Sequence, residues 1–123
     1  DCDNDTLLVL AKNSGPTCHL NNNSCFIGAP SSSCILDELE QTIDTRFKDA
    51  KRSSYTYQLY MDGIKEIAKK ITEEAGEVSI SAVTDDGRVI DESADLMYHL
   101  LVMLRKLNLS HSDVLQELKN RSK

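Results

Sequence analysis

The chain has 123 residues, which is room for about one domain, and 40% of its residues are hydrophobic. Its formal net charge of −6 argues against nonspecific binding of nucleic acid, which requires a basic face. No apolar run approaches the roughly 18 residues that a membrane-spanning helix needs, so we expect no membrane partner. The chain lacks tryptophan and has few aromatic residues, and a core of aliphatic side chains is typical of packed helices.

The first part of the chain differs in composition from the rest. Residues 1–33 contain one basic residue, Lys12, and are rich in Asn, Ser and Cys. Residues 7–11 are typical of a short buried strand, and the serines at 31–33 are typical of a linker. The chain opens without a charged leader or an apolar signal core, which favours a cytoplasmic location, and it begins inside a dense motif. We therefore expect a piece of a longer protein.

From Ile35 onward, apolar residues recur with a helical period. A first helix is followed by a polar break at 51–54, and a long helix follows Gly63 and ends at the turn 85–87. A second long helix comes next, and Ser110 with Asp113 predicts a capping box at the start of a last helix. Each helix is expected to bury one apolar face. These faces carry Ile35, Leu36, Leu39 and Ile43 in the first helix, and Ile64, Ile67, Ala68, Ile71, Ala75, Val78 and Ala82 in the first long helix. They carry Leu96, Leu100, Met103, Leu104 and Leu107 in the second long helix, and Val114, Leu115 and Leu118 in the last helix.

Acidic residues gather on the two long helices. Glu73, Glu74 and Glu77 are spaced so that they share one face of the first helix. Glu92 and Asp95 repeat this spacing on the second. A short turn makes the two helices antiparallel neighbours and brings Glu77 and Glu92 to similar heights. The five carboxylates are therefore predicted to converge across one helix–helix contact.

Such a carboxylate group is suited to a hard cation, above all Mg²⁺. Magnesium can neutralise phosphate charge and activate a water molecule. The alternative is a solvated acidic face paired with Lys65, Lys69 and Lys70, which is the commoner meaning of a bare Glu-Glu-x-x-Glu motif. The second acidic pair at matched height favours a functional site.

Four segments in this region together resemble a known enzyme family. They are Ser54–Thr56, Gly63–Lys65, Lys70–Glu77 and Glu92–Leu101. Between about residues 36 and 121 the chain resembles phosphoribosyl-ATP pyrophosphohydrolase, the second enzyme of histidine biosynthesis. The acidic motifs alone would indicate only the wider all-α nucleotide pyrophosphohydrolase superfamily. The Ser-Tyr-Thr and Gly-Ile-Lys elements select this member.

The resemblance implies an all-α helical bundle that forms a homodimer. It also implies hydrolysis of phosphoribosyl-ATP, a small-molecule substrate, between its α and β phosphates, with phosphoribosyl-AMP and pyrophosphate as products. Lys70 would face phosphate. The implied Mg²⁺ ligands are Glu73, Glu74, Glu77, Glu92 and Asp95.

Residues 1–33 resemble the C-terminal part of a second family, phosphoribosyl-AMP cyclohydrolase, which acts next in the pathway. The resemblance rests on the segments 1–5, 15–19 and 24–26. It implies Zn²⁺ ligands at Cys2, Cys18 and Cys25 and Mg²⁺ ligands at Asp1, Asp3 and Asp5. Free buried thiols are the alternative reading of these cysteines.

These readings predict a cyclohydrolase remnant and linker at residues 1–33 and a pyrophosphohydrolase domain at 34–123. In the parent protein the two activities would be fused, and we expect this fragment to lack the cyclohydrolase activity. Two alternatives to the pyrophosphohydrolase stay open: a related nucleoside triphosphate pyrophosphohydrolase, and a non-catalytic helical interaction module. His99 lies among apolar residues and is predicted to be a packed, hydrogen-bonded histidine.

Overall fold

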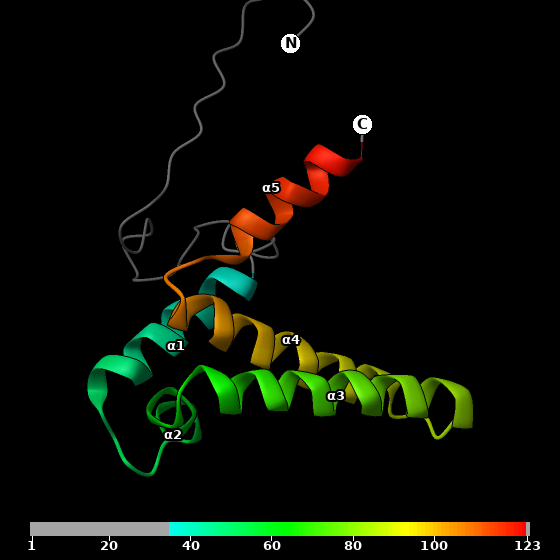
Figure 1. The fold of residues 1–123 in the computed structure, drawn as a ribbon, viewed down its shortest axis with the longest axis horizontal. Coiled ribbons are helices and arrows are strands. Elements are labelled where there is room, and N and C mark those ends of the chain that lie inside the picture. The colour runs from blue at the N-terminus through cyan, green and yellow to red at the C-terminus, as the bar shows by residue number, and fades with distance from the viewer. Residues whose placement is uncertain (1–34, 123) are drawn as a thin grey trace, which may run out of the picture. The chain divides into compact units, whose positions relative to one another are not determined.

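The computed structural model describes residues 35–122, which form helices and no strand (Figure 1). The prediction of an all-α fold is therefore confirmed for this part of the chain. The strand predicted at residues 7–11 lies outside the described residues. The helices are α1 (Ile35–Asp49), α2 (Tyr55–Asp62), α3 (Ile64–Thr84), α4 (Val89–Lys106) and α5 (His111–Arg121).

Local signals in the sequence account for where several helices begin. The side chain of Ser110 accepts a hydrogen bond from the backbone at the start of α5, and Asp113 reciprocates, so the predicted capping box is confirmed. Ser54 caps α2 in the same way by accepting a bond from the Tyr57 backbone N–H at 3.4 Å. Helix α2 was not assigned from the sequence, although the Ser54 cap signals its start.

The two long helices α3 and α4 lie side by side as an antiparallel hairpin (Figure 1). The predicted turn between them is confirmed, with Asp85 in the left-handed conformation at φ 53°. Asp86 accepts a short hydrogen bond from the Ser81 hydroxyl and one of 2.9 Å from the Arg88 backbone N–H. These two bonds hold the pKa of Asp86 below its usual range, and they tie the turn to the end of α3.

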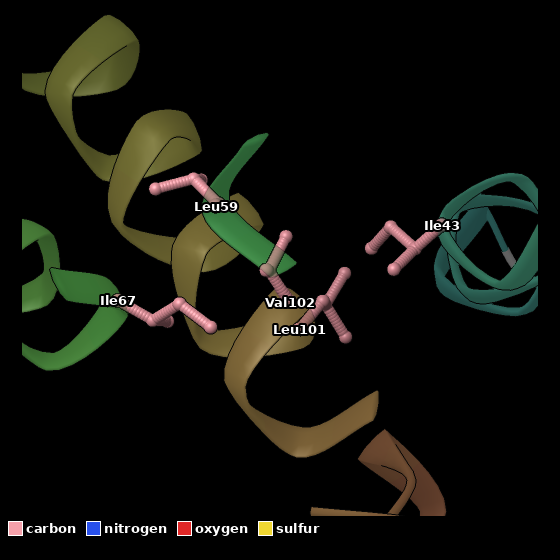
Figure 2. Close-up of a cluster of buried hydrophobic side chains, with 5 residues drawn as sticks. All are labelled: Ile43, Leu59, Ile67, Leu101 and Val102. Atoms are coloured by element: carbon pink, nitrogen blue, oxygen red, sulfur yellow. The ribbon is translucent and has the colours of Figure 1, made fainter. Parts of the chain in front are cut away.

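The core is small and joins four helices. Figure 2 shows its five buried aliphatic side chains gathered between these helices. Burying each such side chain stabilises the fold by about 1.5–3 kcal/mol. The five are Ile43 of α1, Leu59 of α2, Ile67 of α3, and Leu101 and Val102 of α4.

The buried face of α3 differs from the predicted one. Its buried residues are Ile67, Glu74 and Ser81, which stand seven positions apart and share one face. The predicted stripe was right about Ile67, and Ile71 and Val78 are half-buried. It was wrong about other members, because the face toward α4 is shared by polar side chains that the apolar period does not reveal. The exposed members are Ile64, Ala68, Ala75 and Ala82.

The predicted apolar faces of the remaining helices are only partly covered in the described residues. The buried apolar residues of α4 are Leu101 and Val102, which the predicted stripe did not include. The predicted Leu100, and Leu107 just after the helix, are 36% and 50% exposed. On α5, only His111 is buried, and its backbone N–H donates a 2.6 Å hydrogen bond to the Glu40 carboxylate of α1. Apolar side chains at Ile35, Val114, Leu115 and Leu118 face solvent.

None of the helices in the described part of the chain combines the length and the apolar character needed to cross a membrane.

Candidate metal and phosphate site

Three carboxylates meet where α3 packs on α4. Glu74 and Glu77 come from α3 and Glu92 comes from α4, and one oxygen of each lies within 4.8 Å of the others. Glu74 and Glu92 are 8% and 2% exposed, while Glu77 lies at the solvent edge. We call these three residues the acidic cluster. The predicted approach of Glu77 and Glu92 across the hairpin is thus observed.

The electrostatics of the acidic cluster favour a bound cation. Burial raises the pKa of Glu92, and a hydrogen bond with Glu77 and the nearby negative charges raise it further. One buried oxygen of Glu92, Oε1, has no regular hydrogen bond, although the Arg88 guanidinium lies against it as an ion-pair partner. A divalent cation would relieve the repulsion and occupy this oxygen.

The donor set matches the chemistry of Mg²⁺. All three donors are carboxylate oxygens, which are the ligands that hard divalent cations prefer. The exposed Glu77 leaves one side of the cluster open to water and to a phosphate group. The residues present therefore fit a hard divalent cation such as Mg²⁺.

Lys70 supplies a positive charge next to the acidic cluster. Its ammonium group donates a 2.8 Å hydrogen bond to Glu73, one turn away on α3. This bond is the main reason that the pKa of Lys70 is raised and that of Glu73 is lowered. Both groups are therefore charged at neutral pH, as expected of a lysine that binds phosphate.

The structure brings together three of the five predicted carboxylates. Glu73 is exposed and paired with Lys70, and Asp95 is exposed on α4, so neither belongs to the acidic cluster. The spacing of Glu73 and Asp95 predicts that they share a face with the acidic cluster, but both are exposed and outside it. Their assignment as metal ligands stays a prediction.

The solvated-face alternative accounts for only part of this surface. Lys69 pairs with Glu66 at 3.3 Å and Lys70 pairs with Glu73, as that alternative expects. No lysine of the described residues forms an ion pair with a member of the acidic cluster. The cluster is thus distinct from the ordinary lysine-paired surface of α3.

Two further residues adjoin the cluster. His99 of α4 is 5% exposed, and its Nδ1 lies 3.7 Å from the Glu74 carboxylate. Its Nε2 forms a 3.0 Å hydrogen bond with the hydroxyl of Tyr55 on α2. The prediction of a packed, hydrogen-bonded histidine is confirmed. Tyr55 stands in the Ser-Tyr-Thr segment that carries the resemblance, and through this bond its hydroxyl reaches the histidine beside the acidic cluster.

The ligands predicted in the N-terminal segment lie outside the described residues. They are Asp1, Asp3 and Asp5 for Mg²⁺ and Cys2, Cys18 and Cys25 for Zn²⁺. These assignments stay predictions.

Comparison with known proteins yields two family matches along the chain. Residues 36–122 match the family described as phosphoribosyl-ATP pyrophosphohydrolase, and residues 1–27 match the one described as phosphoribosyl-AMP cyclohydrolase. The first match covers the acidic cluster and Lys70.

Curated relatives carry both regions in one protein. The histidine biosynthesis bifunctional protein HisIE of Yersinia pestis is 48% identical over 122 residues, covering 98% of this chain and 60% of that protein. HisIE of Campylobacter jejuni is also 48% identical, over 126 residues, covering 100% of this chain and 61% of that protein. HisIE of Salmonella typhi is 45% identical, covering 98% and 60%. The chain thus spans about three fifths of the length of these relatives.

Proposed function

Since the chain belongs to the phosphoribosyl-ATP pyrophosphohydrolase family through residues 36–122, we propose that this region converts phosphoribosyl-ATP into phosphoribosyl-AMP and pyrophosphate. The reaction is the second step of histidine biosynthesis, and the relatives named above are histidine biosynthesis proteins. The observation that supports the proposal most directly is the acidic cluster next to Lys70, inside the matched region.

The acidic cluster would hold Mg²⁺ through Glu74, Glu77 and Glu92. A bound Mg²⁺ would neutralise the charge that develops on the phosphate oxygens and lower the pKa of a coordinated water. The geometric support is the triangle of carboxylate oxygens, and the electrostatic support is the raised pKa of Glu92. Glu73 and Asp95 stay candidate ligands at the edge of this site.

The other residues of the site would bind and orient the substrate. Lys70, charged and held by Glu73, would bind a phosphate of the triphosphate chain. In the reaction, a water oxygen forms a bond to phosphorus and the bond to the oxygen bridging the α and β phosphates breaks. Pyrophosphate leaves with the electrons of that bond, and a nearby carboxylate accepts the proton of the water.

A turnover assay with purified protein tests this function. We expect pyrophosphate release from phosphoribosyl-ATP in the presence of Mg²⁺ and its loss when EDTA removes the metal. Parallel assays with ATP and dUTP distinguish the related nucleoside triphosphate pyrophosphohydrolase, which would prefer these substrates. A folded protein that releases no pyrophosphate from any of the three would favour the non-catalytic helical module.

We also propose that the parent protein is bifunctional. Its N-terminal part would be a phosphoribosyl-AMP cyclohydrolase that consumes the product of the pyrophosphohydrolase. The support is the family match of residues 1–27 and the similarity to relatives named as bifunctional proteins. Zinc and magnesium binding by this part, and a cytoplasmic location for the whole, belong to the same proposal.

A homodimer would cover the apolar faces that the described residues leave exposed. Side chains of α4 and α5 line a groove of about 380 Å³ that includes Leu100, Met103, Val114 and Leu115. Large exposed apolar surfaces of this kind mark protein interfaces. Light scattering coupled to size exclusion would then give about twice the 13.7 kDa of one chain. A mass of one chain at micromolar concentration would contradict the proposal.

A further inference from the structure

A chain of contacts from three helices ends at the acidic cluster. His99 of α4 is buried at its centre. Its Nε2 contacts the Tyr55 hydroxyl of α2 at 3.0 Å, and its Nδ1 contacts the Asp95 backbone carbonyl at 2.9 Å. The same Nδ1 lies 3.7 Å from Oε1 of Glu74 on α3. One imidazole therefore connects the exposed Tyr55 to a buried member of the acidic cluster.

The partners of the ring determine where its protons are. A backbone carbonyl can only accept a hydrogen bond, so Nδ1 of His99 carries a proton that it donates to Asp95. In the neutral imidazole Nε2 is then an acceptor, and the Tyr55 hydroxyl donates to it. Burial is the main reason that the pKa of Tyr55 is raised, which keeps this hydroxyl protonated at neutral pH.

This arrangement places an N–H group beside Glu74. A carboxylate near an N–H dipole is held in one orientation, because rotating it away loses the electrostatic attraction. Glu74 forms no ion pair with a lysine or arginine among the described residues, and His99 is the ion-pair neighbour that the structure gives it. The imidazole is thus placed beside Glu74 at a distance where it acts on the carboxylate through electrostatic attraction.

We propose that His99 is a positioning residue for Glu74, and that the Tyr55 hydroxyl fixes the ring that does this positioning. The inference rests on the proposed function, since it requires that the acidic cluster bind a divalent cation. Removing a group that hydrogen-bonds to or orients a metal ligand lowers metal affinity or activity by about 10–100-fold. The role assigned here is to prepare Glu74 for the cation, without contact with the substrate.

The test measures metal binding directly, with Mn²⁺ as the probe, by isothermal titration calorimetry on the full chain without substrate. Mn²⁺ accepts the same oxygen ligands as Mg²⁺. The N-terminal segment has predicted metal ligands of its own, so the binding at the acidic cluster has to be distinguished from theirs. The Mn²⁺ binding that Glu77→Gln loses relative to the wild type is the part that belongs to the acidic cluster. Melting temperatures of all variants are measured in parallel.

Four variants separate positioning from packing. Tyr55→Phe removes only the hydroxyl. His99→Gln can keep an amide near Nε2 but loses the group at Nδ1, and His99→Asn does the reverse. Tyr98→Phe is the matched control, because it removes another hydroxyl bond between α2 and α4, of 2.7 Å to Thr56, next to His99 in the sequence.

We expect Tyr55→Phe and His99→Gln to weaken Mn²⁺ binding by about 10-fold or more. His99→Asn, which restores an N–H near Nδ1, should bind closer to the wild type than His99→Gln does. Tyr98→Phe should bind Mn²⁺ like the wild type even if its melting temperature falls. If His99→Gln fails to fold, Tyr55→Phe still tests the positioning role, because Tyr55 is half-exposed and its loss of a hydroxyl should leave the fold intact.

Two results would overturn the inference, and a third would overturn its premise. Wild-type Mn²⁺ affinity in Tyr55→Phe and His99→Gln would show that neither residue positions a ligand. A raised KM of Tyr55→Phe for phosphoribosyl-ATP with unchanged Mn²⁺ affinity would make Tyr55 a substrate contact instead. If Glu77→Gln leaves all Mn²⁺ binding intact, the acidic cluster is not the metal site. That result would contradict the proposed function itself, and not only the role of His99.

Discussion

Glu77 and Glu92 meet in the acidic cluster but differ in their surroundings. Glu92 is buried between α3 and α4, and its pKa is raised, whereas Glu77 reaches solvent. Two carboxylates this close repel each other when both are ionised, and a cation between them relieves that repulsion. Each residue therefore gives a separate prediction, one for catalysis and one for stability.

Replacing Glu77 by Gln should remove catalysis while the fold is kept. We expect kcat/KM for phosphoribosyl-ATP to fall at least about 100-fold, because loss of a direct ligand should exceed the effect of losing its neighbours. The metal-free protein should melt no lower than the wild type, since like-charge repulsion is reduced. Pyrophosphate release at limiting Mg²⁺ is the measurement.

The control for Glu77→Gln is Glu66→Gln on the same helix. Glu66 is exposed and pairs only with Lys69, so its loss should leave turnover unchanged. Wild-type turnover of Glu77→Gln at limiting Mg²⁺ would rule out its assignment as a ligand.

The raised pKa of Glu92 predicts how stability depends on pH without metal. In the unfolded chain this group ionises near its ordinary value of about 4.3, whereas the folded protein holds the proton to higher pH. Stability contributed by the protonated group is therefore lost as the pH rises through that window. Glu92→Gln should remove this loss and raise the urea midpoint of the metal-free protein at neutral pH.

Magnesium should reverse the order of these two proteins. The wild type should gain stability on addition of Mg²⁺, because the ion binds the ionised carboxylates of the folded state only. The Glu92→Gln protein should gain little. An unchanged midpoint of Glu92→Gln in EDTA at neutral pH would contradict the assigned electrostatics.

At the scale of elements, the site depends on how α2 is joined to the α3–α4 hairpin. Gly63 ends α2 and precedes α3, with φ 89° and ψ 179°, a conformation that is accessible almost only to glycine. The joint directs α2 so that Tyr55 reaches His99 and Leu59 enters the core. This single residue therefore connects the packing of α2 with the geometry beside the acidic cluster.

Gly63→Ala should lower the free energy of unfolding by about 1–3 kcal/mol, since the strain lies in the backbone. No atom would lie within 4 Å of the added Cβ, so steric overlap is not the cause. Gly76→Ala within α3 is the matched control, because its added Cβ also meets nothing within 4 Å. That change should stabilise the protein by about 0.5–1 kcal/mol through helix propensity. Equal effects of the two substitutions in urea unfolding would refute this explanation.

At the scale of the whole molecule, residues 35–122 contain both a core and the candidate site. The five core side chains and the acidic cluster all lie on α1 to α4. Helix α1 begins at Ile35, close to the predicted domain boundary at residue 34. The boundary itself stays a prediction that a shortened chain can test.

A chain of residues 35–123 should keep the pyrophosphohydrolase activity of the full chain, with the same kcat/KM for phosphoribosyl-ATP. The reason is that every proposed residue of this site lies in that range. Circular dichroism establishes that the shortened chain is helical, and Glu77→Gln in it provides the inactive control. A folded but inactive shortened chain would show that residues 1–34 contribute to the reaction.

The sequence by itself determined the helical class, the hairpin of two long helices, the capping box at Ser110 and the approach of Glu77 to Glu92. These features follow from local spacing and turn chemistry, which need no knowledge of distant neighbours. The motifs around Lys70 and Glu92 also indicated the family, which the match over residues 36–122 established.

The tertiary structure alone decided which face of each helix is covered. A shift of one residue along a helix rotates a side chain by about 100°, so Ile67, Glu74 and Ser81 are buried while Ala68, Ala75 and Ala82 are exposed. For the same reason Glu73 and Asp95 are exposed and outside the acidic cluster. The tertiary structure also brought His99 between Tyr55 and Glu74, because three helices have to pack before those side chains can meet.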